Sequence, residues 1–129
     1  MAKIIVVDNN LDMCQIISDI LKEGGHTVNI SYNGKDALRK IKKNHYDLIV
    51  LDYRLSGISG LVVLEKALQM MPLLKAIMIS AFGSDSTKTK ARELGAVDFI
   101  DKPFDIKRFV QAVQDILTRD TNKEKLKEE

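Results

Sequence analysis

The sequence has little cysteine and almost no net charge. Its single cysteine, Cys14, cannot form a disulfide within the chain, and no CxxC pair or paired Cys and His spacing suggests zinc. Twenty basic residues against 18 acidic ones leave a net charge of +2, which does not favour nucleic-acid binding through bulk charge. The lack of paired cysteines is typical of proteins in a reducing compartment, so we expect a cytoplasmic protein.

Long apolar runs are also missing. The longest, such as residues 48–51 and 76–79, fall far short of the roughly 20 residues that a membrane span requires. The opening residues MAKIIVVDNN bring an acid and amides too early for a signal peptide. With 129 residues, 45% of them hydrophobic, the chain fits one compact domain, and we predict no membrane association.

Three short runs are apolar and rich in β-branched residues without alternating with polar ones. This pattern, at residues 4–7, 48–51 and 76–79, is typical of strands buried on both faces of a parallel sheet. Two weaker runs, at residues 27–32 and 97–100, each follow a glycine, Gly25 or Gly95, that is suited to ending a helix. The sequence therefore predicts five strands.

Amphipathic segments follow these runs and predict helices. We expect Asn9 or Asn10 to cap the first helix, Asn33 and Asp36 to form a capping-box-like start of the second, and Asp105 to cap the fifth. The expected apolar stripes are Met13, Ile16, Ile17, Ile20 and Leu21; Ala37, Leu38 and Ile41; Leu61, Leu64, Leu68 and Met71; and Ile106, Phe109, Val110, Val113, Ile116 and Leu117.

The fourth predicted helix, at about residues 84–94, differs from the others. Its apolar face offers only Thr87, Ala91 and Leu94. Because so little burial holds it, we predict that it is the most mobile helix of the domain.

Five strands alternating with five helices predict an α/β fold, a doubly wound parallel sheet with helices on both faces. Ligands of such sheets bind beyond the carboxyl ends of the strands, near the topological switch point. We assign residues 1–118 to this domain and residues 119–129, which carry charges of both signs and one apolar residue, to a charged tail, a frayed helix end or a linker.

Polar residues follow four of the predicted strands. Asp8 and Asn9 follow the first strand, Asp52 the third, Ser80 the fourth and Lys102 the fifth. Two carboxylates at one edge repel each other unless a cation lies between them, and hard oxygen ligands suit Mg²⁺. A carboxylate nucleophile, a metal, an ammonium group and a hydroxyl donor are what phosphoryl transfer requires, and we predict Asp52 as the nucleophile.

Each of these residues also has a structural explanation. An aspartate such as Asp8 or Asp52 often caps a helix or starts a turn, and a serine or lysine at a strand end is often merely solvated. The conjunction of four suitable residues at neighbouring strand ends favours a functional site. We interpret Cys14, His26 and His45 as core, turn and surface residues.

With these motifs in place, residues 3 to about 118 resemble the receiver domains of two-component response regulators. The first strand and its acidic end (IIVVDNN), the segment LIVLDYRLSGISG, the strand IMISAFG and the ending GAVDFIDKPFD carry the resemblance. It implies the flavodoxin-like (βα)5 receiver fold with strand order 2-1-3-4-5. It also implies a signalling switch that catalyses only its own phosphorylation and dephosphorylation.

The resemblance assigns roles to individual residues. Asp52 accepts a phosphoryl group from a histidine kinase or phosphotransfer protein, and Ser80 and Lys102 hold the phosphoryl oxygens. Asp8, Asn9, Asp52 and the backbone carbonyl of Arg54 form the Mg²⁺ site. Ser80 and Phe99 act as the switch, Arg54 and Phe82 flank the approach of water, and the Lys102–Pro103 peptide is expected to be cis.

Phosphorylation is then expected to draw the Ser80 hydroxyl inward and Phe99 into the space behind it. This changes partner binding on the surface formed by the fourth helix, fifth strand and fifth helix. Homodimerisation through this surface stays open, as do the output partner and any further domain. We expect no direct contact of this domain with nucleic acid or membrane.

The sequence departs from the family pattern at position 9, where receivers usually have a second acid and this chain has Asn9. An amide oxygen can still coordinate Mg²⁺ but brings no charge, so we expect weaker Mg²⁺ binding than in a receiver with both acids. Ser56 and Ser59 replace a frequent proline and a frequent aspartate, and Phe99 replaces a frequent tyrosine.

Two other functions compete with this one. A pseudo-receiver would bind partners without phosphorylation, and Asn9 would be the mark of a decaying metal site. A flavodoxin-type electron carrier shares the fold, but the turn DNNLDMC lacks a glycine and hydroxyl cradle for a flavin phosphate, and the chain has no tryptophan. Neither GxGxxG nor GxxxxGK[ST] is present for a nucleotide.

Overall fold

The computed structural model describes residues 2–81 and 83–128, with side chains described as far as Thr118 apart from Phe82. Strands and helices alternate, and each predicted strand is found within one residue of its expected limits. The elements are β1 (Lys3–Val7), α1 (Leu11–Glu23), β2 (Thr27–Ser31), α2 (Gly34–Lys43), β3 (Leu48–Asp52), α3 (Gly60–Met70), β4 (Lys75–Ser80), α4 (Asp85–Glu93), β5 (Asp98–Asp101) and α5 (Ile106–Glu128).

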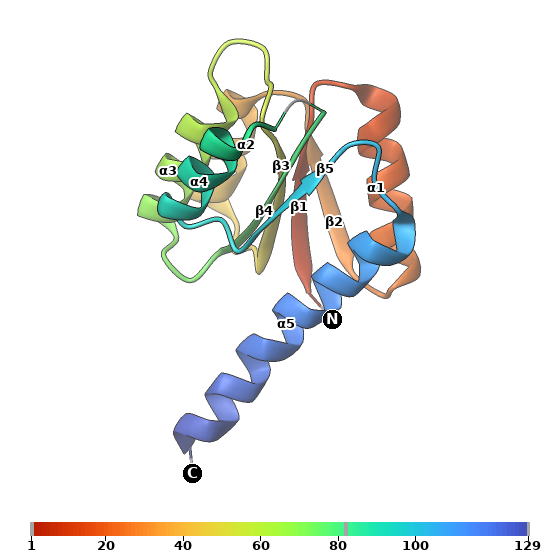
Figure 1. The fold of residues 1–129 in the computed structure, drawn as a ribbon. Helices are drawn as coiled ribbons and strands as arrows, with labels where there is room; N and C mark the ends of the chain where they lie inside the picture. Colours follow the sequence, from red (N-terminus) through yellow and green to blue (C-terminus); the bar gives the residue numbers. More distant parts are fainter. Residues whose placement is uncertain (1, 82, 129) are drawn as a thin grey trace.

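The strands form one parallel sheet in the order β2-β1-β3-β4-β5, which confirms the predicted fold (Figure 1). The register pairs Val7 of β1 with Leu51 of β3, so Asp8 and Asp52 come at the same level of two neighbouring strands. The direction of winding changes between β1 and β3, which is the topological switch point. The two acids therefore lie where this fold class binds ligands.

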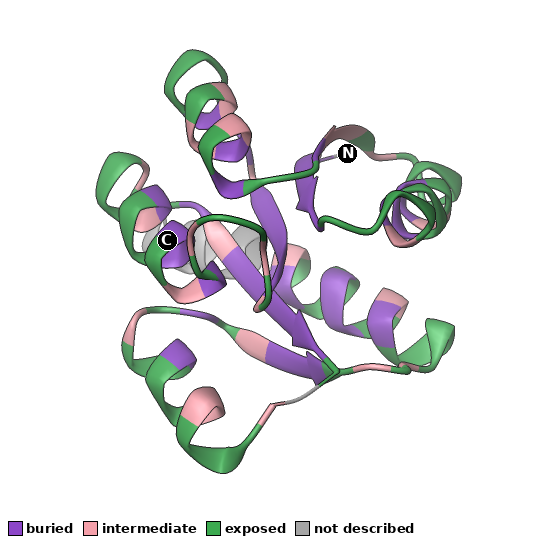
Figure 2. Ribbon diagram, turned by 90° about the horizontal axis from the view of Figure 1, so that it is seen from above, coloured by how far each residue is buried: buried purple, intermediate pink, exposed green. Residues whose placement is uncertain are grey.

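Helices cover both faces of the sheet, with α2, α3 and α4 on one face and α1 and α5 on the other (Figure 1). Seen from above, the buried strands lie between helices that are exposed on their outer sides (Figure 2). Each face has its own apolar cluster, because successive side chains of a strand point to opposite faces. Ile49, Leu51 and Met78 belong to the first cluster, and Val50, Ile77 and Ile79 to the second.

Asparagine side chains cap the first two helices. Asn10, rather than Asn9, caps α1 and accepts a hydrogen bond from the backbone N–H of Met13 at 3.0 Å. Asn33 caps α2 and accepts from the backbone N–H of Asp36 at 2.8 Å. The Asp36 carboxylate binds Ser31, Arg39 and Lys40 instead of completing a reciprocal capping box. Both helix starts are thus satisfied locally.

Three apolar stripes are narrower or shifted relative to the prediction. Ile16 of α1 and Ile106 of α5 were expected to be buried but are 50% and 55% exposed. In α3 the fully buried side chains are Val63, Leu64 and Ala67, whereas Leu61, Leu68 and Met71 are only partly buried. The reason is that each helix touches the sheet over a limited arc, whereas the apolar residues cover a wider one.

The glycines expected to end helices do so. Gly25 and Gly95 follow α1 and α4 with φ of 88° and 114°, a backbone conformation that other residues rarely adopt. At Gly95 a Cβ would also lie 2.6 Å from Cδ1 of Leu68. These turns fix where β2 and β5 begin.

The helices that flank β5 are packed very differently. Of the described residues of α4, Ala91 alone is buried, as the sparse apolar pattern predicted. In α5, Phe109, Ala112, Val113 and Ile116 are buried. Helix α5 continues past residue 118 to Glu128, so the predicted division at residues 118 and 119 is not a boundary of secondary structure. Over the described residues, no helix is long and apolar enough to cross a membrane.

Strand β2 forms one edge of the sheet. Thr27 donates to Ala2 and Ser31 accepts from Asp8, so the backbone groups of the intervening Val28 and Ile30 face outward. The Val28 carbonyl accepts a hydrogen bond from the Asn29 side chain at 3.4 Å, and the Ile30 carbonyl accepts one from Nζ of Lys40. Both outward carbonyls are therefore occupied by side chains of the same chain.

Candidate functional site

Three charged side chains from separate strand ends meet at the carboxyl edge of the sheet. Nζ of Lys102 lies 2.8 Å from Oδ2 of Asp8 and 3.3 Å from Oδ2 of Asp52. Asp8 is 1% exposed and Asp52 is 6% exposed, so both acids are shielded from solvent. The three residues, called the acid pocket below, are thus brought together as the sequence predicted, and their chemical roles stay predictions.

Backbone and side-chain donors hold Asp8 in place. The backbone N–H of Asn10 donates to Oδ1 of Asp8 at 2.9 Å. The buried Cys14 thiol donates to the backbone carbonyl of Asp8 at 3.1 Å, a contact that sequence reasoning missed. Burial, with a smaller effect of the Asp8 charge, raises the pKa of Cys14 to about 11, so the thiol stays neutral and inert. The prediction that Cys14 is a core residue is confirmed.

The loop after β3 positions Asp52 from its other side. The Arg54 backbone N–H faces Oδ1 of Asp52 at 3.4 Å. The Gly60 N–H donates to the Tyr53 carbonyl at 2.9 Å, and a Cβ at Gly60 would clash with the backbone carbonyl oxygen of Asp52. A residue without a side chain is therefore required where α3 begins behind the acid.

Burial dominates the electrostatics of the pocket. Burial, together with the charge of Asp8, raises the pKa of Asp52 above its ordinary value, although Lys102 acts in the opposite direction. Burial lowers the pKa of Lys102, but the two acids outweigh it, so its pKa is raised above the ordinary value. Lys102 is thus charged at neutral pH, and with both acids ionised the pocket has a net negative charge.

Near the pocket, the remaining side chain that could bind a metal ion is the neutral amide of Asn9. Asn9 is exposed, and its amide nitrogen lies 3.4 Å from Oγ of Ser56 across the edge of the sheet. Within the described part of the chain, no three His, Cys, Asp or Glu residues are grouped closely enough to hold a metal ion. The oxygen groups described here are two carboxylates and the Asn9 amide, a hard-oxygen set that suits Mg²⁺ with several retained waters.

Ser80 lies at the end of β4 and Phe99 within β5, the two strands that follow β3 in the sheet. Ser80 is 1% exposed at the end of β4, and its carbonyl accepts from the Lys102 backbone N–H at 2.8 Å. The Lys102–Pro103 peptide is cis, as expected. The Phe99 ring is 6% exposed and belongs to the apolar cluster under α4. Phe82, predicted to flank the approach of water with Arg54, lies outside the described residues.

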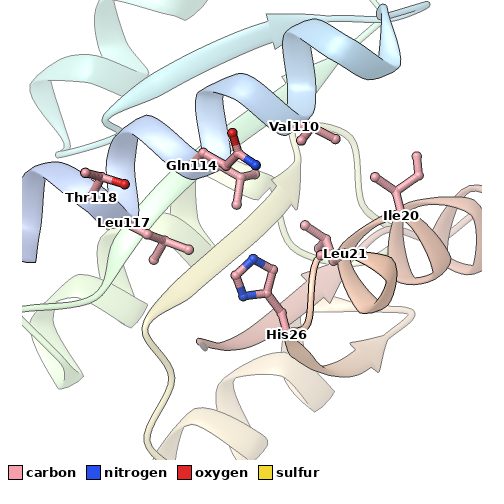
Figure 3. Close-up of a pocket in the computed structure, with 9 residues that line it drawn as sticks. Ile20, Leu21, His26, Val110, Gln114, Leu117 and Thr118 are labelled. Carbon is pink, nitrogen blue, oxygen red and sulfur yellow. The ribbon is translucent and has the colours of Figure 1, made fainter.

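A hollow elsewhere on the surface is unrelated to these residues. It has a volume of about 200 Å³ and lies between α1 and α5, lined by Ile20, Leu21 and Leu117 among others (Figure 3). His26, just before the amino end of β2, lies in its wall and accepts a hydrogen bond from the Ala2 backbone N–H at 3.2 Å. This hollow thus lies at the opposite end of the strands from the acid pocket. His45 is exposed, as expected.

Comparison with known proteins agrees with this geometry. The chain is 31% identical over 123 residues to the transcriptional regulatory protein ZraR of Salmonella typhimurium, covering 94% of this chain and 28% of ZraR. It is 32% identical over 124 residues to the response regulator ArlR of Staphylococcus aureus, covering 96% of this chain and 56% of ArlR. The chain thus spans between about a quarter and about half of these curated relatives.

Solved structures show the same fold. A CheY-like receiver domain protein from Methanospirillum hungatei superposes with a TM-score of 0.92 at 24% identity, covering 95% of this chain and 98% of that one. NtrX from Brucella abortus gives a TM-score of 0.90 at 31% identity, covering 97% of this chain and 29% of NtrX.

The family itself follows from a match over most of the chain. A family model described as the response regulator receiver domain matches residues 4–114, from β1 into α5. That range contains Asp8, Asp52 and Lys102 with the strands that hold them. The chain therefore belongs to the receiver domains of two-component response regulators, a family of signalling switches.

Proposed function

We propose that this receiver is an active phosphoacceptor, with Asp52 as the acceptor. The observation that carries the proposal is the contact of one ammonium group, Nζ of Lys102, with the carboxylates of both Asp8 and Asp52. An isolated capping or turn aspartate would have no reason to be buried beside a second acid. Burying two carboxylates and an ammonium group costs free energy. Phosphoryl transfer is a function that uses all three groups and would explain why they are kept together.

The reaction that this pocket supports is transfer from a phosphohistidine. A carboxylate oxygen of Asp52 attacks phosphorus, the bond from phosphorus to the donor's imidazole nitrogen breaks, and the imidazole takes up a proton. Lys102 neutralises charge on the phosphoryl oxygens, and Ser80 donates a hydrogen bond to one of them. The donor is a sensor histidine kinase or a phosphotransfer protein.

Receivers generally use Mg²⁺ at this site, and the oxygen donors described above fit it. Asp8, Asp52, Asn9 and the Arg54 backbone carbonyl would hold the ion. When bound, Mg²⁺ supplies positive charge to the transferring phosphoryl group. With Asn9 in place of an acid, the site has one negative charge fewer, so we expect weaker Mg²⁺ binding than in receivers with both acids.

The signal leaves the pocket through Ser80 and Phe99. Formation of the acyl phosphate draws the Ser80 hydroxyl toward it, and the Phe99 ring fills the space behind. The ring is already buried in this structure, so burial of Phe99 would be stabilised rather than created. The α4-β5-α5 surface then changes its affinity for an output partner. That partner can be a second copy of this chain, which would give a homodimer. Residues 119–129 would form the tail or linker of the domain, which we expect to act in the cytoplasm.

The intact mass of the protein after incubation with acetyl phosphate tests the proposal. We expect a phosphoryl adduct that depends on Mg²⁺ concentration and is absent from Asp52→Ala. An adduct on the Asp52→Ala protein would show that another residue accepts the phosphoryl group. No adduct on the wild type at any Mg²⁺ concentration would favour a pseudo-receiver that binds partners without phosphorylation.

A further inference from the structure

Helix α4 is attached to β5 by a charged contact that the motifs did not predict. Nζ of Lys88 in α4 lies 2.8 Å from Oδ2 of Asp101 in β5. The same ammonium lies 5.7 Å from the centroid of the Phe99 ring. Lys88 is only 26% exposed, so its aliphatic part is largely covered. One side chain therefore contacts both the end of β5 and the face of the aromatic ring.

The Phe99 ring is also confined at its outer end. A Cβ at Gly83, in the loop before α4, would lie 2.6 Å from Cε1 of Phe99 and 3.2 Å from Oδ1 of Asp101. The ring thus fits between the Gly83 backbone and the Lys88 side chain. Because Ala91 alone is buried among the described residues of α4, these contacts add to an otherwise small apolar attachment of the helix.

Asp101 and Lys102 are adjacent, and they point to different parts of the molecule. Asp101 and Phe99 are two residues apart in β5, so their side chains point to the same face of the sheet, and Asp101 contacts α4. The Lys102 side chain extends into the acid pocket. The Lys102 backbone N–H donates to the Ser80 carbonyl. Because Asp101 and Lys102 are joined by one peptide bond, a shift of the Lys102 backbone would also move the backbone that carries Asp101, the partner of Lys88.

We propose that the neighbours Asp101 and Lys102 couple the acid pocket to α4 through the Asp101–Lys88 ion pair. Rearrangement of Lys102 around a new anion at Asp52 shifts the end of β5, and Lys88 transmits that shift to α4. Lys88 and Asp101 are positioning residues here, since neither touches the acids. The coupling deepens the proposed function, but the contacts that carry it exist whether or not Asp52 is phosphorylated.

The first experiment needs no ligand. In ¹⁵N-labelled protein, Lys102→Met should shift the amide signals of α4, residues 85–93. In the Lys88→Met and Asp101→Asn backgrounds we expect that response to fall to about half or less, because each variant removes one partner of the ion pair. Lys90→Met, on an exposed position of the same helix, should leave it unchanged. An equal α4 response with and without Lys88 would overturn the proposal.

A second experiment applies if Lys102→Met does not fold, as judged by its thermal unfolding. Beryllofluoride with Mg²⁺, a phosphoryl analogue, is added to the wild type and to Lys88→Met. We expect amides around Asp52 to respond equally in both proteins and α4 amides to respond less in Lys88→Met. Full α4 response in Lys88→Met would refute the coupling. If the wild type shows no response around Asp52, the phosphoacceptor function is refuted. The coupling to α4 in response to a phosphoryl group is then refuted as well.

Discussion

The interior of this protein is of two kinds, and they are stabilised in opposite ways. The apolar layers on the two faces of the sheet contain residues such as Phe109 and Ile77, whose burial favours folding. The acid pocket at the carboxyl edge buries Asp8 and Asp52 around a single ammonium. Burying like charges costs stability. The difference teaches that the apolar layers stabilise the fold, whereas the acid pocket costs it stability, which is expected of a site kept for the proposed chemistry.

The largest expected effect is in the apolar layers. Phe109 is fully buried and packs against Phe104 with ring centroids 5.2 Å apart. Phe109→Ala should lower the free energy of unfolding by about 3–5 kcal/mol, because it removes buried apolar surface and leaves a cavity. Urea denaturation measures this. Ile106→Ala, at an exposed position of the same helix, is the matched control and should cost far less.

The acid pocket should respond in the other direction. Because burial and Asp8 raise the pKa of Asp52, the ionised carboxylate is less stable in the folded protein than in the unfolded chain. Asp52→Asn should therefore raise the thermal midpoint at pH 7. The advantage should shrink as the pH falls through the raised pKa of Asp52 towards 3.8, since the wild type then binds a proton. Glu65→Gln, exposed on α3, should change little, and a lower midpoint for Asp52→Asn would mean that the Lys102 contact outweighs burial.

Adding charge to the pocket sharpens the contrast. Asn9→Asp should bind Mg²⁺ about tenfold more tightly, since one more negative charge near a divalent ion contributes on the order of 1 kcal/mol or more. Calorimetric titration with Mg²⁺ measures the change. In metal-free buffer the same variant should be no more stable than the wild type, and an unchanged Mg²⁺ affinity would contradict the role given to Asn9.

The smallest effect concerns pH and phosphoryl acceptance. In the proposed reaction Asp52 must be ionised to attack phosphorus, so lowering the pH should slow adduct formation from acetyl phosphate. The midpoint of this decline should lie above 3.8, because the pKa of Asp52 is raised. Initial rates from pH 8 down to about pH 3.5 at saturating Mg²⁺ measure it, after correction for protonation of the donor. A rate independent of pH over this range would mean that bound Mg²⁺ lowers the pKa of Asp52 enough to cancel the effect of burial.

The sheet and the meeting of the pocket residues could be predicted from sequence because both follow from local patterns. Unbroken apolar runs identify the strands, and parallel strands bring the polar residues after them to one edge. Asp8 and Asp52 each come directly after an unbroken run, whereas Lys102 comes two residues after the weaker run at residues 97–100. The fold rules then bring them together, although they are far apart in the chain.

What could not be predicted depends on which arc of a helix meets the sheet. Ile16 and Ile106 continue apolar stripes yet are exposed, since periodicity gives the direction of a stripe and not its buried width. The contact of Lys88 with Asp101 and Phe99 had no sequence signal, because a lysine on a polar helix is usually solvated. The Cys14 hydrogen bond to the Asp8 backbone was likewise hidden, since an apolar stripe accounts for a buried cysteine equally well.

The occupied carbonyls of β2 also bear on aggregation. A sheet edge with open backbone groups is a template on which a strand of another chain can add, and natural proteins often block such edges with lysine. An incoming strand would have to displace Lys40 from the Ile30 carbonyl and Asn29 from the Val28 carbonyl. Tyr46, whose hydroxyl donates to Asn29 at 2.7 Å, restrains the second of these. The two outward carbonyls of the β2 edge are therefore partly protected against the addition of a strand from another chain.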